Sequence, residues 1–185
     1  QLERLKDEVK VYRDEFGIPH IFAQNEDDLY LVTGYVTAQD RFWQMDFLRR
    51  VTQGRLSEIL PGDWIETDLI LRSLRIQDKS EIIFEKATPE IRKAMQSFSN
   101  GVNLYLKDHT NDLSFEFTVF GYEPDDWEPI HSLNLIGFMA WDLETGWKNE
   151  STLFKLKNVL SEEKFKELLP DQLIRNSVIY EELKG

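Results

Sequence analysis

The residues that could carry acid–base or nucleophilic chemistry are scattered along this sequence. The three histidines are His20, His109 and His131, and no two of them have the spacing of a metal-binding pair. We therefore expect ordinary polar histidines of the surface or core. The sequence also lacks a glycine-rich phosphate loop and the GxSxG motif of serine hydrolases. The residues alone thus indicate an active site that is incomplete within this chain.

Two acid pairs, Asp125-Asp126 and Glu162-Glu163, are the candidates for paired-carboxylate chemistry. The first pair falls in a turn and the second at a helix start, where solvation and helix capping explain acidic residues. A glycosidase-like pair has no other support in the sequence. The absence of cysteine excludes a cysteine nucleophile, a disulfide framework and thiolate-bound zinc.

The composition is that of a globular protein with an acidic surface. The 185 residues are 41% hydrophobic and 12% aromatic, which is enough to bury a core. A formal net charge of −12 repels phosphate backbones and anionic lipid, so we exclude nucleic acid and the membrane as main partners. No apolar run is long enough to span a bilayer. We treat residues 1–185 as one domain.

A hairpin is predicted near the start of the chain. Residues 9–13 alternate apolar and polar side chains, which is the pattern of a half-buried strand. Gly17 and Pro19 then indicate a turn, because glycine reaches backbone angles that a side chain obstructs. Residues 20–23 return as a second short strand.

One long amphipathic helix, or two, is predicted next. Asn25 is a good N-cap, and helical spacing of apolar residues continues to Phe47. Gly34 marks either close packing or a break in this segment. Spacing of three or four residues gives a shared face to Tyr35, Gln39, Phe42 and Trp43. Asp40 and Arg41 project elsewhere and need polar partners, and we interpret the whole segment as scaffold.

The rest of the sequence predicts mainly helices. The expected elements are a helical region over residues 67–86, a helix that starts at Thr88-Pro89, a strand over residues 113–117, a turn-rich loop over residues 121–129, a helix through Leu135 to Leu143, and a short helix from Ser161 to Pro170.

Five segments form an ordered set of motifs. They are residues 11–21 (VYRDEFGIPHI), 34–45 (GYVTAQDRFWQM), 54–60 (GRLSEIL), 121–127 (GYEPDDW) and 139–143 (MAWDL). Arg49 and Arg50 extend the second segment toward the third. In order and spacing, these segments resemble the penicillin acylase family of N-terminal-nucleophile hydrolases, and the resemblance covers most of the chain.

The resemblance implies a precursor that cuts itself into two chains. In the family, the cut frees a serine at the head of a larger second chain, and the α-amino group of that serine acts as the base. The oxyanion hole also belongs to the larger chain. This chain would then be the small α subunit, with no catalytic residue of its own. Its first residue, Gln1, cannot serve as such a nucleophile.

The fold implied by the resemblance is α+β: a mostly helical subunit of an αββα N-terminal-nucleophile hydrolase, completed by a larger β subunit. The implied reaction is hydrolysis of a linear amide to a carboxylic acid and an amine. Two classes of substrate stay open, β-lactam antibiotics that carry an acyl side chain and N-acyl homoserine lactones. The rival interpretation is a non-enzymatic binding or structural subunit.

The helix near residue 140 carries the candidate substrate pocket. Met139, Asp142 and Leu143 lie at i, i+3 and i+4, so one helical face presents all three. In the family, the matching stretch lines the pocket for the acyl group. Penicillin G acylases have an Arg-Phe pair where this chain has Asp142-Leu143. This departure puts a phenylacetyl preference in doubt, and Leu143 suits an aliphatic or differently shaped acyl chain.

The resemblance also implies a structural calcium ion shared with the larger subunit. The family places an acidic ligand where this chain has Glu150, and calcium prefers hard oxygen ligands. Glu144 is the alternative ligand, because the spacing from Met139 differs by one residue from some members.

Two further expectations concern processing and location. Gly185 is expected as the processing site, because a glycine often precedes the catalytic serine in this family and lets the backbone bend for attack. We also expect a periplasmic or secreted protein. The sequence starts at Gln1 without a charged-then-apolar leader, so either a leader was removed or the sequence was trimmed.

Overall fold

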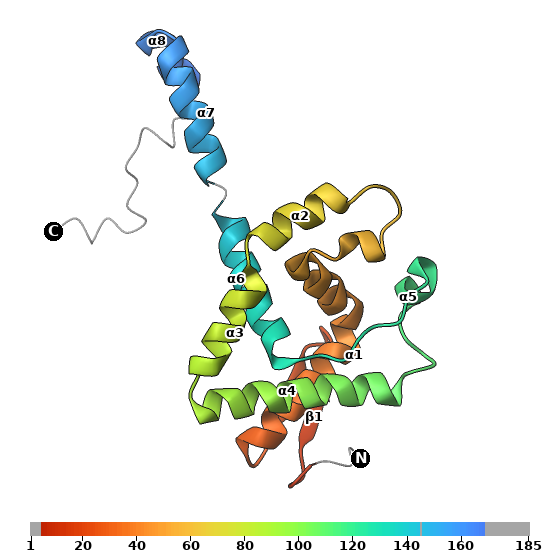
Figure 1. Cartoon of the computed structure of the whole chain (residues 1–185). Coiled ribbons are helices and arrows are strands. Elements are labelled where there is room, and N and C mark those ends of the chain that lie inside the picture. The colour runs from red at the N-terminus through yellow and green to blue at the C-terminus, as the bar shows by residue number, and fades with distance from the viewer. Residues whose placement is uncertain (1–4, 145, 169–185) are drawn as a thin grey trace, which may run out of the picture. The chain divides into compact units, whose positions relative to one another are not determined.

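The computed structural model of the chain describes residues 5–144 and 146–168, over which the protein is mostly helical (Figure 1). Contacts divide the chain into two compact units, Gln1–Ala140 and Trp141–Gly185. The expectation of one domain over residues 1–185 stays a prediction. In chain order, the elements are β1 (Lys10–Arg13), β2 (Pro19–Phe22), α1 (Glu26–Gln53), the 3-10 turn η1 (Leu56–Glu58), α2 (Ile65–Ser73), α3 (Ile76–Lys86), α4 (Pro89–Asp108), α5 (Phe115–Phe120), α6 (Pro129–Leu143), α7 (Gly146–Val159) and α8 (Glu162–Leu168).

The strands β1 and β2 form the hairpin that the sequence predicts. They pair antiparallel, with Val11 opposite Ile21. The Asp14 carboxylate holds the turn, because it accepts hydrogen bonds from two backbone N–H groups of the turn at 3.0 and 2.9 Å. Gly17 has a φ of 77°, in the left-handed region that favours glycine. The turn chemistry read from the sequence is therefore confirmed.

The helix α1 begins at its predicted cap. The Asn25 side chain accepts a hydrogen bond from the backbone N–H of Asp28 at 2.9 Å. The helix ends at Gly54, whose left-handed φ of 60° lets its N–H reach carbonyls of the last turn. One interior residue, Arg41, has non-helical backbone angles. The sequence left open one helix or two, and the structure shows two helical stretches joined at a kink.

The helices α1 and α4 make the most extensive contact among the described elements (Figure 1). Two glycines allow their close approach. A Cβ atom on Gly34 would lie 2.1 Å from the carbonyl oxygen of Phe98, and one on Gly101 would lie 1.9 Å from that of Leu31. No side chain fits at either position without moving the facing backbone. Gly34 therefore marks close packing, and the kink lies elsewhere.

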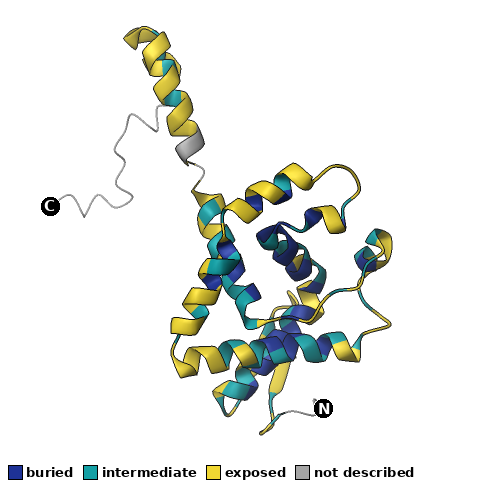
Figure 2. Cartoon of the chain, in the orientation of Figure 1, coloured by how far each residue is buried: buried dark blue, intermediate teal, exposed yellow. Residues whose placement is uncertain are grey.

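Figure 2 shows buried residues gathered where α1 and α4 cross. The main core cluster consists of Ala38, Phe42, Met45, Val102, Tyr105, Phe117 and Trp127. It draws on α1, α4, α5 and the loop before α6, so segments far apart in the sequence share one apolar interior. The predicted shared face of α1 contributes Phe42 to the cluster, with Tyr35 and Trp43 packed against it.

The expectation of a strand over residues 113–117 is wrong. The helix α5 (Phe115–Phe120) occupies the end of this segment, and Gly121 ends it with a left-handed φ of 67°. Phe117 is buried and stacks on a core aromatic ring at 5.7 Å, whereas Phe115 is exposed. The alternating pattern was too short to specify a strand, and the packing of one aromatic residue determined the local structure instead.

The helical region expected over residues 67–86 is divided into α2 and α3. The break falls at Arg75, which has a φ of 52° and pairs its side chain with Asp78 in the first turn of α3. Asp68 in α2 accepts hydrogen bonds from two backbone N–H groups of η1 at 2.8 and 2.9 Å. These local contacts fix the chain between α1 and α3.

The second unit contains α7 and α8, whose described residues are mostly exposed (Figure 2). The predicted cap Ser161 accepts a hydrogen bond from the backbone N–H of Lys164 at 3.4 Å. Pro170, which we expect to close this helix, lies outside the described residues. In the part of the chain that the structure describes, no helix combines the length and the apolar character needed to cross a bilayer.

We expect the substitution Gly101→Ala to destabilise the protein by about 2 to 3 kcal/mol, because a Cβ at this position forces α1 and α4 apart. Gly146→Ala is the matched control, since a Cβ there meets nothing within 4 Å and alanine is the better helix former. Denaturant unfolding of both variants measures the difference. Equal stabilities of the two variants would contradict the close approach.

Candidate functional site

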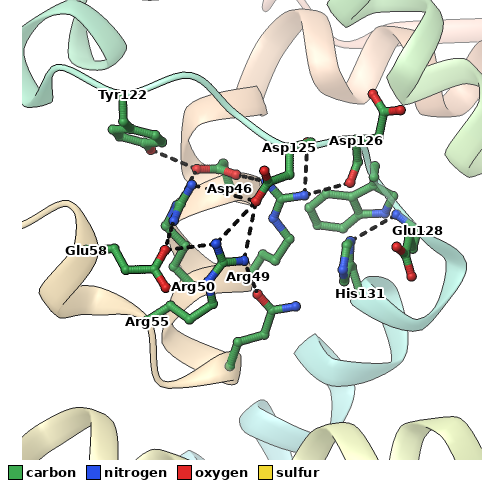
Figure 3. Close-up of polar contacts among 12 residues, drawn as sticks. Asp46, Arg49, Arg50, Arg55, Glu58, Tyr122, Asp125, Asp126, Glu128 and His131 are labelled. Carbon is green, nitrogen blue, oxygen red and sulfur yellow. Dashed lines mark hydrogen bonds and ion pairs between the residues drawn. The ribbon is translucent and has the colours of Figure 1, made fainter.

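A buried carboxylate in the second half of α1 brings several of the sequence motifs together. Asp46 is fully buried and pairs with Arg49 and Arg50, one helical turn later (Figure 3). The distance from Arg50 Nε to Asp46 Oδ2 is 3.1 Å. Arg49 and Arg50 are themselves 1% and 4% exposed. Because a buried charge is stable only when it is paired, these three side chains depend on one another.

Arg49 connects α1 to the loop before α6. Its Nη1 donates to the backbone carbonyls of Asp125 and Asp126 at 3.0 and 2.8 Å. The same guanidinium lies over the ring of Trp127, 5.6 Å from its centroid. The Asp125 carboxylate also lies 3.3 Å from Arg55. Solvation at a turn therefore does not fully explain the acid pair Asp125-Asp126. The backbone carbonyls of both residues accept hydrogen bonds from Arg49, and the Asp125 carboxylate pairs with Arg55.

Two further side chains complete the cluster (Figure 3). Glu58 Oε2 accepts from Arg50 Nη1 at 2.9 Å and from Arg55 Nη2 at 2.8 Å. The hydrogen bond from Arg55 holds the pKa of Glu58 below its usual value. Tyr122 donates its hydroxyl to Asp46 Oδ2 at 2.7 Å. Burial, reinforced by this bond to Asp46, raises the pKa of Tyr122, so the phenol stays protonated and remains a donor.

The first turn of α6 is fixed by the neighbours of Trp127. The side chain of Asn103, in α4, bonds both the carbonyl and the N–H of Trp127 at 3.0 and 2.6 Å. Trp127 Nε1 donates to Ser132 Oγ at 3.3 Å, and His131 Nδ1 accepts from the backbone N–H of Glu128 at 2.9 Å. The start of α6 is thus tied to α1 through Arg49 and to α4 through Asn103.

The three predicted pocket residues lie at the other end of α6. Met139 is 58% exposed, Leu143 is 76% exposed, and Asp142 is also exposed. Neither apolar residue belongs to a core cluster of the described residues. A helix held at its first turn therefore carries accessible apolar side chains at its last turn. The assignment of these residues to a substrate pocket stays a prediction.

Comparison with known proteins assigns this chain to a family. The sequence profile of the family described as Penicillin amidase matches residues 8–178. The chain belongs to this penicillin amidase family. It is 36% identical to a penicillin G acylase from Escherichia coli over 143 residues, which cover 75% of this chain and 17% of that protein. The resemblance inferred from the five motifs is therefore confirmed.

Other relatives in the penicillin amidase family are named either penicillin acylase or acyl-homoserine lactone acylase. The chain is 35% identical over 153 residues to a penicillin acylase 2 proenzyme from a Pseudomonas species, covering 83% of this chain and 19% of that protein. It is 30% identical over 169 residues to the acyl-homoserine lactone acylase QuiP of Pseudomonas syringae, covering 91% and 20%. The chain thus spans about a fifth of the length of these relatives.

A solved structure of the family matches over nearly its whole chain. It is a thermostable penicillin G acylase from Alcaligenes faecalis, with a TM-score of 0.70 and 25% sequence identity. The match covers 94% of this chain and 94% of that chain. The mostly helical fold is therefore one that a penicillin G acylase also contains.

The predicted calcium ligand and the predicted processing site are the remaining residues to be located in the structure. Among residues 5–144 and 146–168, no group of three or more His, Asp or Glu side chains could hold a metal ion. Glu150 in α7 and its alternative Glu144 are both exposed. The described part of the chain therefore offers single carboxylates rather than a calcium site. Gly185 lies outside the described residues.

Sequence reasoning missed the polar cluster around Asp46. It kept Arg49 and Arg50 only as an extension of a motif, and it treated His131 as an ordinary histidine. The available signal was an acid followed by two arginines at i+3 and i+4 in one predicted helix, which predicts local ion pairs. Nothing in the spacing indicated that these pairs are buried.

The buried His131 makes the stability of the fold dependent on pH. Burial, reinforced by the positive charge of Arg49, lowers the pKa of His131 to about 4. An unfolded chain has a histidine pKa of about 6.5. Between these two values the unfolded state binds a proton that the folded state does not, so stability falls as the pH drops. Above this window the contribution of His131 is fully present.

We expect the free energy of unfolding to fall by about 2 kcal/mol more between pH 7 and pH 5 in the unchanged protein than in His131→Asn. Asparagine keeps an acceptor near the backbone N–H of Glu128 but does not titrate. Urea unfolding across this pH range measures both curves. Parallel curves would show that His131 is protonated equally easily in the folded state.

Proposed function

We propose that this chain is the small α subunit of a heterodimeric acylase that hydrolyses linear amide bonds. The proposal rests on a difference between two comparisons, one with the length of the relatives and one with a chain of a solved structure. The chain spans about a fifth of its curated relatives, yet it matches 94% of one chain of a solved penicillin G acylase. One relative is also named a proenzyme. A separate polypeptide cut from a longer precursor accounts for both coverages.

The catalytic groups belong to the larger chain in this proposal. The serine at the head of that chain attacks the amide carbonyl, and the amine leaves with a proton that the serine hydroxyl gave up. Water then hydrolyses the acyl-enzyme to a carboxylic acid and restores the serine. The present chain contributes no nucleophile and acts by positioning, which agrees with histidines engaged in local contacts: His20 with Asp14, His109 with Tyr105, and His131 with Glu128.

The contribution of this chain to the site is one wall of the acyl pocket. Met139, Asp142 and Leu143 are exposed at the last turn of α6, where an apolar substrate or the larger chain would cover them. The two candidate substrates, acylated β-lactams and N-acyl homoserine lactones, correspond to the two kinds of name among the relatives. A periplasmic or secreted location is part of the same proposal.

We expect amide hydrolysis only when both chains are present. The test expresses the complete precursor, residues 1–185 alone, and a precursor in which the first residue of the second chain is replaced by alanine. The processed precursor should hydrolyse an acyl amide, while the other two should be inactive and the alanine variant should stay uncut.

Two outcomes would contradict this function. Turnover by residues 1–185 alone, at the rate of the processed precursor, would place the nucleophile in this chain. A processed, correctly folded two-chain protein that hydrolyses no acyl amide would favour the rival function, a binding or structural subunit without catalysis.

Leu143 is expected to help set the acyl-chain preference. An apolar pocket discriminates by about 1–3 kcal/mol for each methylene group that fits or fails to fit. Leu143→Phe should therefore lower kcat/KM for a long aliphatic amide relative to a short aromatic one by about tenfold, and Leu143→Ala should shift the ratio the other way. The measurement is this ratio in the processed enzyme.

The matched control for Leu143 is Leu69, which is 63% exposed in α2. Leu69→Phe and Leu69→Ala carry the same changes of side chain on a different helix. They should leave the ratio of kcat/KM unchanged. If the Leu143 variants behave like the Leu69 variants, Leu143 is not part of the acyl pocket.

Glu150 is proposed as one ligand of a structural calcium ion. Because the described residues lack a ligand cluster, the larger chain has to supply the other oxygen ligands. Glu150→Ala should lower the calcium content of the purified two-chain protein and its thermal stability, and Glu144→Ala should change neither. Elemental analysis measures the calcium. Unchanged calcium in Glu150→Ala, or its loss in Glu144→Ala, would overturn the assignment.

A further inference from the structure

The last turn of α6 contains an acidic residue at a position that disfavours negative charge. Asp142 lies one residue before the end of this helix at Leu143. The carbonyl groups at the C-terminus of a helix carry partial negative charge, so this end stabilises lysine or arginine and destabilises a carboxylate. The last turn of α6 contains no basic residue. The Asp142 carboxylate therefore adds to the local negative charge instead of balancing it.

No described positive charge compensates for this carboxylate. The sequence contains no lysine or arginine between Lys107 and Lys148, so α6 has neither of its own. Asp142 is exposed, and its carboxylate forms no hydrogen bond or ion pair with the side chains that the structure describes. By contrast, the acids Asp46 and Glu58 are paired with arginine. Neither ion pairing nor helix capping therefore explains the acid at position 142.

Asp142 lies beside an exposed apolar stripe of α6. The stripe consists of Ile136, Met139 and Leu143, which follow one another at helical spacing and are all exposed. At a rise of 1.5 Å per residue, these side chains extend over roughly 10 Å. Asp142 comes three residues after Met139 and directly before Leu143, so it lies at the C-terminal end of the stripe. One ligand can therefore cover the apolar side chains and place a charged group near the carboxylate.

The charge of such a ligand decides how it interacts with this end of α6. A carboxylate attracts a positively charged group and repels another carboxylate, and both effects grow when a bound ligand displaces water. The partial negative charge of the helix C-terminus acts in the same direction. So does the net charge of −12, which attracts cations from a greater distance. All three contributions favour a ligand with a positive charge.

We propose that Asp142 makes the acyl pocket select substrates by the charge of their acyl group. An acyl chain that carries an ammonium group is favoured, and one that carries a carboxylate is disfavoured. The inference rests on the proposed function, because it requires Met139, Asp142 and Leu143 to line the acyl pocket. Asp142 takes no part in the bond changes at the amide. It interacts equally with the bound substrate and the transition state, so its effect falls on KM more than on kcat.

The test compares three nitroanilides that differ only at the far end of the acyl chain. The hexanoyl compound is neutral at that end, the aminohexanoyl compound carries an ammonium group, and the adipoyl compound carries a carboxylate. Hydrolysis by the processed two-chain enzyme at neutral pH releases the same nitroaniline from each, so absorbance gives kcat and KM for all three. We expect a higher kcat/KM for the ammonium substrate than for the carboxylate substrate, with most of the difference in KM.

Two variants at position 142 test whether this residue causes the preference. Asp142→Asn keeps the size of the side chain and removes its charge. It should lower the ratio of kcat/KM between the ammonium and the carboxylate substrate by about tenfold, because an attraction and a repulsion are lost together. Asp142→Lys should reverse the preference. Both variants remove a negative charge from a helix C-terminus, so we expect them to fold, and urea unfolding checks this.

The matched control is Asp112→Asn, which makes the same change at another exposed aspartate, between α4 and α5. It should leave the ratio of kcat/KM unchanged. Added salt should narrow this ratio in the unchanged protein and have little effect in Asp142→Asn, because salt screens the interaction between charges. If Asp142→Asn has the same ratio as Asp112→Asn, the inference is overturned.

The proposed function and this inference can fail separately. If the unchanged two-chain enzyme hydrolyses none of the three nitroanilides and no other acyl amide, both fail. If it hydrolyses the nitroanilides with a ratio that does not depend on residue 142, the enzyme is an acylase whose acyl pocket does not select by charge through Asp142. A ratio that falls in Asp142→Asn and reverses in Asp142→Lys supports both.

Discussion

The structure depends on one buried carboxylate. Asp46 has no exposed surface, and it holds the charges of Arg49 and Arg50 and the hydroxyl of Tyr122 within the first unit. Three arginines and three carboxylates, completed by Arg55, Glu58 and Asp125, balance within this cluster. Removing one partner of such a pair costs about 3 to 5 kcal/mol, because it leaves an uncompensated charge inside the protein. The position of the loop before α6, and hence the start of α6, follows from this pairing.

The rigid and the accessible parts of the molecule are separated along α6. Its first turn is bonded to α1 and α4 through Arg49 and Asn103, and its last turn presents Met139 and Leu143 to solvent. The polar contacts of the first unit thus fix the start of α6, and the side chains at its end are exposed.

Local features of this chain were predictable, and long-range ones were not. The hairpin, the Asn25 cap and the turn at Gly17 follow from residues within a few positions of one another. The strand expected over residues 113–117 failed because packing of Phe117 on α1, far away in sequence, overrode a weak alternation. The pocket residues came from the resemblance to a family. The cluster around Asp46 was missed because its bonds to residues 122 to 126 join positions 76 and 77 residues apart, which periodicity cannot register.

The same sequence separation governs how this chain can fold as it is synthesised. Asp46 meets Arg49 and Arg50 as soon as α1 coils, since they lie three and four residues apart. The carbonyls that Arg49 also needs are made 76 and 77 residues later, which at about 5–20 residues per second is a delay of roughly 4 to 15 seconds. During that interval the nascent chain carries two arginines and one carboxylate on what will become an interior face. All of α1 is therefore synthesised several seconds before the residues that bury its charged side chains.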